Sequence, residues 1–515
     1  MQNSKNNSTK KYNLGIIGSG PAGYTAAIRA SQLGKTVILF EKEHLGGVCL
    51  NKGCIPTKTF LYSADLYNSI KKASNFGVEI EKFSLNFEKV VERKEKIVEK
   101  LRKSLEMLLK SHGIEIVMAE ATMVNVSEKE KASSEAEVWR YGGIEVRNDE
   151  NPKSHTSIHP AFHSSVLPLT SHLSLIEADG EVYECEHVLI ATGSEPVCVG
   201  GFEFDHEFIL SSDDVLELKI LPEKVLIVGS GAIGVEWARI FSSFGTEVTI
   251  VELADKLLPL ADFEISQRLE RIFKMSKVKM FLSISVKEIK EKKVTLSNGE
   301  VLEPDFVLFA TGRKPLTPNP SNRQVDTLPS TARKDSPIRG AAARGEGSND
   351  SSHLSPLTSH FIGDAYGSIQ LAHFASHQAI QVVENIVLGK KIEEFITPFV
   401  VYGNPEIAWA GATEQDLISK NVEYKKSVFP VSALGKSATE GNLEGFVKIL
   451  ADEKGKILGA HIISKEASAL IHQLTIAMQN DLGVDELKKC CFAHPTYSEG
   501  VYESLKLIIG EEVKS

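Results

Sequence analysis

The chain has 515 residues, more than one hydrophobic core usually organises, so several domains are expected. Hydrophobic residues make up 42% of the chain and charged residues 24%, which excludes wholesale disorder and fibrous architectures. The formal net charge of −10 argues against nucleic acid as a partner. Residues 1–11 lack the apolar core of a secretion signal, and no apolar run reaches the ~18 residues of a membrane span. A soluble, cytoplasmic protein without a membrane partner is therefore expected.

Residues 13–41 have the pattern of a strand–helix–strand unit that binds a dinucleotide. An apolar run leads into Gly18, Gly20 and Gly23, a helix pattern of small residues follows, and a second apolar run ends in Glu41. The first two glycines allow a tight turn and let a pyrophosphate approach the positive N-terminus of the helix. The carboxylate is expected to accept hydrogen bonds from a ribose.

Residues 46–58 contain two of the six cysteines of the chain, a number too small for a disulfide scaffold. Cys49 and Cys54 flank four residues, and Pro56 stands where a helix over 57–73 is expected to begin. A bend that contains glycine can bring two such cysteines within bridging distance, and a thiolate at a helix N-terminus is stabilised by the helix dipole. We predict a redox-active pair in which Cys54 is the better stabilised thiolate. Two inert core thiols are the alternative, and zinc would need two further ligands.

Residues 127–172 and 317–360 have little periodicity and are expected to be surface loops or partly disordered insertions. Three histidines of the first segment are spaced by four and could share one helix face: His155, His159 and His163. Pro160 interrupts that helix, so no metal site is predicted.

The layout of the first unit returns over residues 224–252. Gly229, Gly231 and Gly234 form the second turn, and Glu252 closes the second apolar run. In both copies the first glycine and the closing glutamate are 23 residues apart, since 41 − 18 equals 252 − 229. One glycine pattern is weak evidence, but two copies with a common spacing are strong. A carboxylate at 252 repels a 2′-phosphate, so NAD is preferred over NADP.

A histidine near the C-terminus is followed five residues later by a carboxylate. The pair, His494 and Glu499, could hold an imidazole in one tautomer and stabilise its protonated form, as an acid–base catalyst requires. A His-Pro turn alone is more often structural, but a redox pair elsewhere needs a proton acceptor. Cys490 and Cys491 are adjacent, and because a vicinal disulfide is strained they are expected to be buried thiols.

These motifs together resemble those of the pyridine nucleotide–disulfide oxidoreductases, and within that family those of the dihydrolipoamide dehydrogenases. The ending Cys-Ile-Pro-Thr-Lys is more like this branch than like glutathione reductases. The matching motifs lie between residues 13 and 499, so the resemblance covers most of the chain. They are Gly18 to Gly23 with Glu41, Gly46 to Lys58, Gly229 to Glu236, the Ala-Thr-Gly strand ends at 191–193 and 310–312, Gly363-Asp364, and His494 to Glu499.

The resemblance implies an α/β fold with two Rossmann-like dinucleotide-binding domains and a C-terminal α+β dimerisation domain. The strand ends predict boundaries near 195 and 313. The expected division is 12–196 for the first part of the FAD-binding domain, 197–313 for the NAD-binding domain, 314–390 for the second part of the FAD-binding or central domain, and 391–515 for the interface domain.

The resemblance also assigns residues. It implies that FAD is held by Gly18, Gly20, Pro21, Ala22, Gly23, Glu41, Gly47, Lys58, Thr192, Gly193, Gly363 and Asp364, and NAD by Gly229, Gly231, Ile233, Gly234, Glu252 and Gly312. It implies catalytic roles for Cys49, Cys54, His494, Glu499, Lys58 and Glu236. Lys58 and Glu236 would form an ion pair beside the flavin, and His494 would act as a base on the disulfide of the partner subunit.

The implied activity is oxidation of protein-bound dihydrolipoyl groups with reduction of NAD⁺. The implied partners are a second copy of the chain and the lipoyl-bearing acyltransferase subunit of 2-oxo acid dehydrogenase complexes, or a lipoyl carrier protein of the glycine cleavage system. Another FAD-dependent disulfide or mercuric reductase of the family is the alternative enzyme, and a non-catalytic scaffold protein is the alternative from another class. The sequence departs from the family where residues 317–360 lead into Gly363, which puts the strand pairing beneath the flavin site in doubt.

Overall fold

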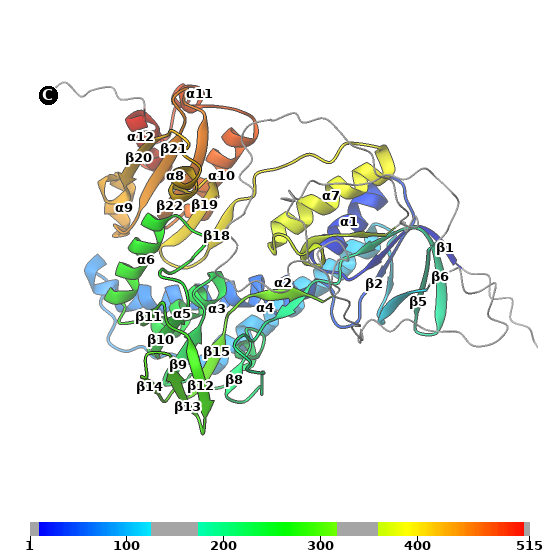
Figure 1. Cartoon of the computed structure of the whole chain (residues 1–515), viewed down its shortest axis with the longest axis horizontal. Coiled ribbons are helices and arrows are strands. Elements are labelled where there is room, and N and C mark those ends of the chain that lie inside the picture. Colours follow the sequence, from blue (N-terminus) through cyan, green and yellow to red (C-terminus); the bar gives the residue numbers. More distant parts are fainter. Residues whose placement is uncertain (1–9, 125–173, 317–358, 509–515) are drawn as a thin grey trace, which may run out of the picture.

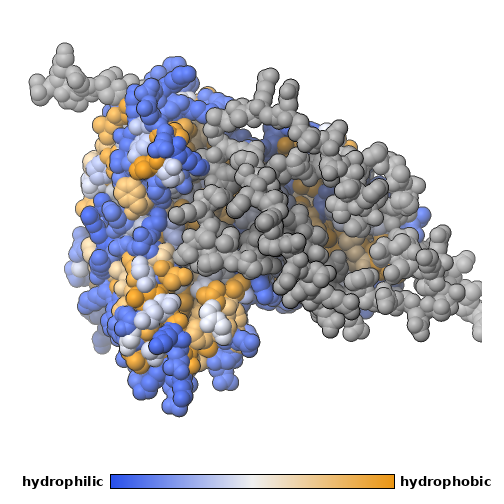
Figure 2. All heavy atoms as spheres, in the orientation of Figure 1, coloured by the Kyte–Doolittle hydropathy of each residue, from blue (hydrophilic) through white to orange (hydrophobic). Residues whose placement is uncertain are grey.

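The computed structural model describes residues 10–124, 174–316 and 359–508. In Figure 1 a first α/β unit lies on the right, a second α/β unit in green lies at the lower left, and the C-terminal part in orange and red lies above the second. Hydrophilic residues cover much of the described surface on this face, with hydrophobic residues in smaller groups between them (Figure 2). No helix among the described residues is long and apolar enough to cross a membrane.

The first unit is built on a seven-stranded sheet with the order β3-β2-β1-β6-β5-β4, in which β17 also pairs with β6. Its strands are β1 (Lys10–Ile17), β2 (Val37–Phe40), β3 (Glu115–Val117), β4 (Ala121–Val124), β5 (Ser174–Ala178), β6 (Glu181–Ile190) and β17 (Ser359–Phe361). The helices α1 (Pro21–Gln32) and α7 (Ala372–Leu388) pack on it through alanine and aliphatic side chains. Since β17 pairs in parallel with β6, the strand that leads into Gly363 lies within the sheet, which resolves the doubt raised by the sequence.

Three helices lie between the two units: α2 (Gly47–Asn51), α3 (Cys54–Lys71) and α4 (Phe87–Ser111), with the short η1 (Ala73–Phe76). The predicted start of the long helix at Thr57 was wrong, because helix α3 already begins at Cys54. Gly53 has a non-helical backbone and ends the preceding turn, while Pro56 sits in the first helical turn, where its missing N–H costs nothing. Phe60 on α3 packs against Trp237 of the second unit, with ring centroids 5.6 Å apart.

The second unit has a five-stranded parallel sheet with the order β11-β10-β9-β15-β8. Its strands are β8 (Ile209–Leu210), β9 (Lys224–Val228), β10 (Glu247–Glu252), β11 (Lys279–Leu282) and β15 (Phe306–Phe309). Its helices are α5 (Ala232–Phe244) and α6 (Phe263–Met275), with the short η3 (Asp214–Glu217). A small antiparallel sheet of the same unit comprises β12 (Val286–Lys290), β13 (Lys293–Leu296) and β14 (Val301–Leu302). Outside these sheets, β7 (Ser194–Pro196) and β16 (Arg313–Pro315) pair in an antiparallel ribbon.

The C-terminal part is an antiparallel sheet with the order β18-β19-β22-β21-β20. Its strands are β18 (Phe399–Val401), β19 (Glu406–Gly411), β20 (Lys425–Pro430), β21 (Phe446–Ala451) and β22 (Ile457–Ser464). The accompanying helices are α8 (Glu414–Ser419), α9 (Gly435–Glu440), α10 (Ala467–Gln479), α11 (Val484–Lys488) and α12 (Glu499–Ile508), with η7 (Val431–Ala433) as a short 3₁₀ turn. A further 3₁₀ turn, η6 (Gly363–Tyr366), belongs to the first unit, between β17 and α7. Helices α10 and α12 bury apolar faces on this sheet.

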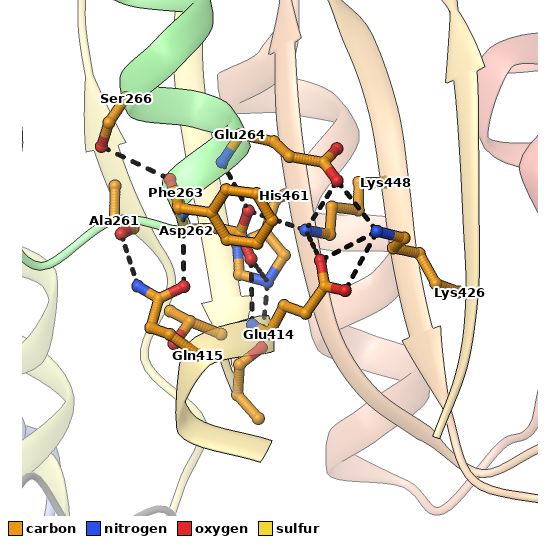
Figure 3. A network of polar contacts seen from close by, with 12 residues as sticks. Ala261, Asp262, Phe263, Glu264, Ser266, Glu414, Gln415, Lys426, Lys448 and His461 are labelled. Carbon is orange, nitrogen blue, oxygen red and sulfur yellow. Dashed lines mark hydrogen bonds and ion pairs between the residues drawn. The ribbon is translucent and has the colours of Figure 1, made fainter. Parts of the chain in front are cut away.

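A buried polar network joins the second unit to the C-terminal part (Figure 3). Lys448 on β21 is fully buried, and its Nζ lies 2.8 Å from Asp262 Oδ1, at the start of α6, and 2.5 Å from Glu414 Oε2. Its ammonium also lies 4.7 Å from the centre of the Phe263 ring. Because a buried charge is costly unless it is paired, these contacts fix α6 against the C-terminal sheet.

Candidate active site

The two cysteines sit at a bend between two helices, next to the first glycine turn. Cys49 lies on α2 and Cys54 is the first residue of α3. A Cβ atom at Gly47 would lie 2.6 Å from the Cα of Gly20, so glycine is required where the bend touches the turn. The bend is held by Asn51, which donates to the carbonyl oxygen of Gly47 at 2.9 Å.

A basic residue on α4 supports the same bend. Arg102 donates two hydrogen bonds to Asn51 Oδ1, at 3.1 and 2.8 Å. The sequence analysis gave neither residue a role. Asn51 lies within the cysteine motif but carries no chemistry there, and its partner Arg102 is 51 positions away and belongs to no motif.

The pKa values of the two thiols are shifted in opposite directions. A hydrogen bond from Cys49, together with the ammonium of Lys58, lowers the pKa of Cys54 to about 7, against the opposing effect of burial. The same hydrogen bond and burial raise the pKa of Cys49 above its ordinary value. These two shifts favour Cys54, the sulfur at the helix N-terminus, as the site of the negative charge in the reduced pair.

A buried ion pair lies beside this thiolate. Lys58 Nζ lies 3.0 and 2.9 Å from the two carboxylate oxygens of Glu236, which is 4% exposed. Although burial lowers the pKa of Lys58, Glu236 raises it above the ordinary value, so this side chain is an ammonium. Tyr402, which the sequence analysis missed, donates its backbone N–H to Glu236 Oε1 at 3.0 Å and places its ring 4.6 Å from the ammonium.

Both glycine turns have the tight geometry that a dinucleotide site requires. A Cβ atom at Gly23 would lie 1.9 Å from the carbonyl oxygen of Gly18, and one at Gly234 would lie 2.0 Å from that of Gly229. At Gly231 a Cβ atom would meet nothing within 4 Å, so the backbone there is open to a ligand. Helices α1 and α5 begin directly after these turns and present their N-termini to the openings.

The other residues assigned to the turns lie around the same openings. Pro21 and Ala22 are in the first turn of α1, and Ile233 is in the first turn of α5. Thr192 and Gly193 lie in the link between β6 and β7, and the Thr192 hydroxyl is buried without a hydrogen-bond partner among the described residues. Gly312 lies between β15 and β16.

The two closing glutamates have matching surroundings. Glu41 Oε2 accepts hydrogen bonds from the backbone N–H of Ser19 at 3.0 Å and from its hydroxyl at 2.6 Å. Glu252 Oε2 accepts from the N–H of Ser230 at 2.7 Å and from its hydroxyl at 2.8 Å. The serines occupy the same place in both Gly-Ser-Gly turns, a signal that the sequence contained and the sequence analysis did not use. Each carboxylate is thereby held at the edge of its turn, where the ribose of a dinucleotide would lie.

The second expected flavin contact lies at the end of the sheet. Gly363 donates its N–H to Gln378 at 2.8 Å, and Asp364 accepts a hydrogen bond from the Ser194 hydroxyl at 2.6 Å. Arg313 donates to the same hydroxyl at 2.9 Å and so links β16 to this point. Burial raises the pKa of Asp364 above its ordinary value. The aspartate is thus half-buried and fixed at one oxygen.

The histidine–glutamate pair forms on the C-terminal part. His494 Nδ1 lies 2.8 Å from Glu499 Oε1, and Glu499 Oε2 accepts the N–H of Thr496 at 2.9 Å. The hydrogen bond with His494 is the main cause that lowers the pKa of Glu499. The side chain of His494 is 74% exposed, and its ring nitrogen Nδ1 contacts Glu499 and not a cysteine. The structure therefore does not bring this pair to the cysteines of the same chain.

The expectation of buried thiols at Cys490 and Cys491 was wrong, because both side chains are exposed. They follow the short α11, of which only Val484 is buried, and so they lie outside the core between sheet and helices. Within the described residues no cluster of three or more His, Cys, Asp or Glu side chains could hold a metal ion. The three histidines of 155–163 lie outside the described residues.

Comparisons with known proteins agree with this geometry. Residues 12–328 match the family described as pyridine nucleotide-disulphide oxidoreductase, and residues 397–505 match its dimerisation domain. The chain is 34% identical to a dihydrolipoyl dehydrogenase of Bacillus subtilis over 96% of its own length and 98% of the relative's. It is 32% identical to the mitochondrial dihydrolipoyl dehydrogenase of Pisum sativum, over 95% of this chain and 90% of that one.

A solved structure shows the same fold. The crystal structure of LpdA from Mycobacterium tuberculosis is similar with a TM-score of 0.75 and 22% identity, over 97% of this chain and 99% of that chain. The first glycine turn, the half-buried Asp364 and the paired cysteines fit FAD in the first unit, and the second turn with its glutamate fits NAD. The chain therefore belongs to the pyridine nucleotide-disulphide oxidoreductases, as an FAD- and NAD-dependent flavoprotein oxidoreductase that ends in the dimerisation domain of the family.

Proposed function

We propose that the protein oxidises protein-bound dihydrolipoyl groups to lipoyl groups and reduces NAD⁺. The observation that carries this proposal is the placement of the two cysteines, Cys49 on α2 and Cys54 at the start of α3, against the first glycine turn and beside the Lys58–Glu236 ion pair. The lowered pKa of Cys54 and the raised pKa of Cys49 are consistent with this arrangement. Such a pair can accept a dithiol at one sulfur and hold the released charge on the other. The relatives named dihydrolipoyl dehydrogenase, which match nearly the whole chain, support a dithiol of the lipoyl type as the substrate.

The exchange chemistry takes place on the chain's own sulfurs. With Cys49 and Cys54 bridged, a thiolate of the dihydrolipoyl group attacks Cys49, and the bond between the cysteines breaks with its electron pair on Cys54. The second substrate thiol then attacks the substrate sulfur that is bonded to Cys49. The bond to Cys49 breaks, the cyclic lipoyl disulfide is released, and both cysteines are left reduced. Lys58, held by Glu236, keeps a positive charge beside the Cys54 thiolate. FAD bound at the first unit supplies a two-electron carrier between this dithiol and NAD⁺.

The base that removes the substrate protons is His494 acting in a homodimer. Its ring is exposed and lies within residues 397–505, which match the dimerisation domain. We propose that it takes the proton of a substrate thiol bound at the partner subunit's Cys49. Glu499, at 2.8 Å, holds the ring in one tautomer and stabilises its protonated form.

NAD⁺ is the proposed acceptor because Glu252 closes the second turn. A carboxylate fixed by the N–H and hydroxyl of Ser230 can accept ribose hydroxyls and repels a 2′-phosphate. The proposed macromolecular substrates are the lipoyl-bearing acyltransferase subunits of 2-oxo acid dehydrogenase complexes, or a lipoyl carrier protein.

The direct test is NADH formation by the purified FAD-loaded protein with dihydrolipoamide and NAD⁺, followed by absorbance. We expect turnover that is lost in Cys54→Ser while bound FAD is retained. Cys198→Ser, at a half-buried cysteine outside the site, is the matched control and should keep the activity. Absence of turnover by the FAD-loaded protein, together with NADH-dependent reduction of glutathione disulfide or Hg(II), would favour another reductase of the family.

A further inference from the structure

A second buried cation lies close to the Lys58–Glu236 pair and has no part in the proposed chemistry. Arg239 is on α5, one helical turn after Glu236, and is 7% exposed. Its Nη1 donates to the carbonyl oxygen of Pro405 at 2.5 Å. Among the described residues its Nε and Nη2 have no hydrogen-bond partner. An arginine buried with two unused donors is costly, so its retention calls for a role.

The guanidinium is fitted closely to the backbone of one loop. A Cβ atom at Gly403 would lie 2.5 Å from Arg239 Nη1 and 2.5 Å from its Cδ, so the side chain lies against this glycine. Gly403 has a φ of +140°, which an L side chain rarely adopts. With the hydrogen bond to Pro405, Arg239 therefore holds residues 403–405 from the side of the second unit.

The same loop covers the ion pair. Its neighbour Tyr402 donates its N–H to Glu236 at 3.0 Å and places its ring 4.6 Å from the Lys58 ammonium. Only two residues separate Tyr402 from the carbonyl oxygen that Arg239 holds. A shift of the loop would therefore take a donor from Glu236 and an aromatic face from Lys58.

The carboxylates around the guanidinium also connect Arg239 to the elements that form the site. Burial lowers the pKa of Arg239 to about 10, while Asp65, Glu236 and Glu406 oppose that shift, so the group stays charged at neutral pH. Asp65 belongs to α3, the helix that begins with Cys54, and Glu406 begins β19 of the C-terminal part. The positive charge of Arg239 thus lies among carboxylates of α3, α5 and β19.

We propose that Arg239 is a positioning residue, which holds Tyr402–Pro405 over the Lys58–Glu236 pair and thereby keeps the Cys54 sulfur in its thiolate form. This inference rests on the role proposed for Cys54 above. Glu236 opposes the Cys54 thiolate and Lys58 favours it. When the loop and the Arg239 charge are lost, Glu236 is less neutralised and the thiolate is less stable.

The test measures the acidity of Cys54 and needs no dihydrolipoyl substrate. In the full-length FAD-loaded protein with Cys49→Ser, Cys54 cannot form a bridge, and its alkylation by iodoacetamide can be followed against pH by peptide mass spectrometry. Arg239→Gln should raise the midpoint of this profile by about 0.5 to 1 pH unit. Arg239→Lys, which keeps the charge but not the planar contact, should give a smaller rise.

Two further variants make the outcome decisive. Gly403→Ala pushes the guanidinium away while its charge remains, and it should raise the midpoint in the same direction even if Arg239→Gln fails to fold. Arg268→Gln is the matched control, because Arg268 lies on α6 of the same unit and pairs with Glu444 at the surface, at 3.3 Å. The proposal would be overturned if Arg239→Gln and Gly403→Ala both gave the same alkylation midpoint as Arg268→Gln. This outcome is independent of whether the protein with both cysteines turns over dihydrolipoamide.

Discussion

Replacement of Lys448 by methionine should open the junction between the second unit and the C-terminal part. Methionine keeps the length of the side chain and removes the ammonium that lies between Asp262 and Glu414 (Figure 3). Glu414 keeps a cation, since Lys426 lies 3.0 Å from its Oε1. Within the described part of the chain, Asp262 keeps the N–H groups of Glu264 at 3.0 Å and Glu414 at 2.9 Å, with His461 3.9 Å away.

The cost follows from the carboxylate that is left behind. Removal of one partner of a buried ion pair costs about 3–5 kcal/mol, and because Glu414 stays paired we expect about 3 kcal/mol. Backbone hydrogen exchange measures this loss in the folded protein, strand by strand. For the amides of β21 we expect exchange about 100-fold faster, since every ~1.4 kcal/mol is a factor of ten.

The matched control is Lys426→Met, whose ammonium contacts Glu414 and Glu264 but is 36% exposed. An exposed pair contributes about 0–1 kcal/mol, so exchange in β21 should change little. Addition of Asp262→Asn to Lys448→Met should recover part of the loss, because it removes the buried negative charge that has lost its partner, while the amide oxygen can still accept one of the two N–H groups. Unchanged exchange in β21 of Lys448→Met would refute the reasoning.

The junction should also respond to acid. Burial opposes ionisation of Asp262 and Glu414, but His461 and Lys448 at the first, and Lys448 and Tyr424 at the second, lower both pKa values below the ordinary range. Groups with a lowered pKa stabilise the fold above their unfolded values of about 4 and lose this contribution as the pH falls through the folded values. The difference between wild type and Lys448→Met in β21 exchange, referred to the intrinsic rate at each pH, should therefore shrink below about pH 4.

Three further predictions concern the site itself. In reduced protein, alkylation of Cys54 should rise with pH through about 7, the value to which its pKa is lowered, and a profile centred near 9, the ordinary thiol value, would contradict the stabilised thiolate. Gly234→Ala places a Cβ atom 2.0 Å from the carbonyl oxygen of Gly229, so NADH binding by titration should be lost while FAD absorbance persists. His494→Gln should lower dihydrolipoamide turnover by about 10²–10⁴-fold. Glu499→Gln should lower it less, and equal rates in wild type and His494→Gln would exclude the imidazole as the base.

The glycine turns and the cysteine bend were predictable because their physics is local. At Gly234 a Cβ atom would lie 2.0 Å from a backbone oxygen, so this position requires glycine. The spacing of the glycines in the sequence therefore predicts the turn. The first turn of α3 was misjudged by three residues, since Pro56 marks a helix start without fixing how many residues precede it. The matching serines beside Glu41 and Glu252 were open to prediction, because they recur at one place in both turns.

The supports of the site were beyond the sequence for a different reason. Tyr402 reaches Glu236 across 166 positions, and Lys448 reaches Asp262 across 186. Neither Tyr402 nor Lys448 belongs to a periodic pattern that distinguishes it from an ordinary core or surface position. The exposure of Cys490 and Cys491 was missed likewise, because it depends on how α11 lies outside the C-terminal core and not on the two cysteines themselves.

The two buried cations cross the same junction in opposite directions. Arg239 extends from the second unit to the backbone of Pro405 in the C-terminal part, whereas Lys448 extends from the C-terminal part to Asp262 of the second unit. A rotation of one part against the other would separate at least one buried charge from its partners, and such a separation is costly in a medium of low dielectric. Because the C-terminal part carries His494, and α5 of the second unit packs on the helix that begins with Cys54, these contacts limit how the base and the cysteines can be placed when two chains combine.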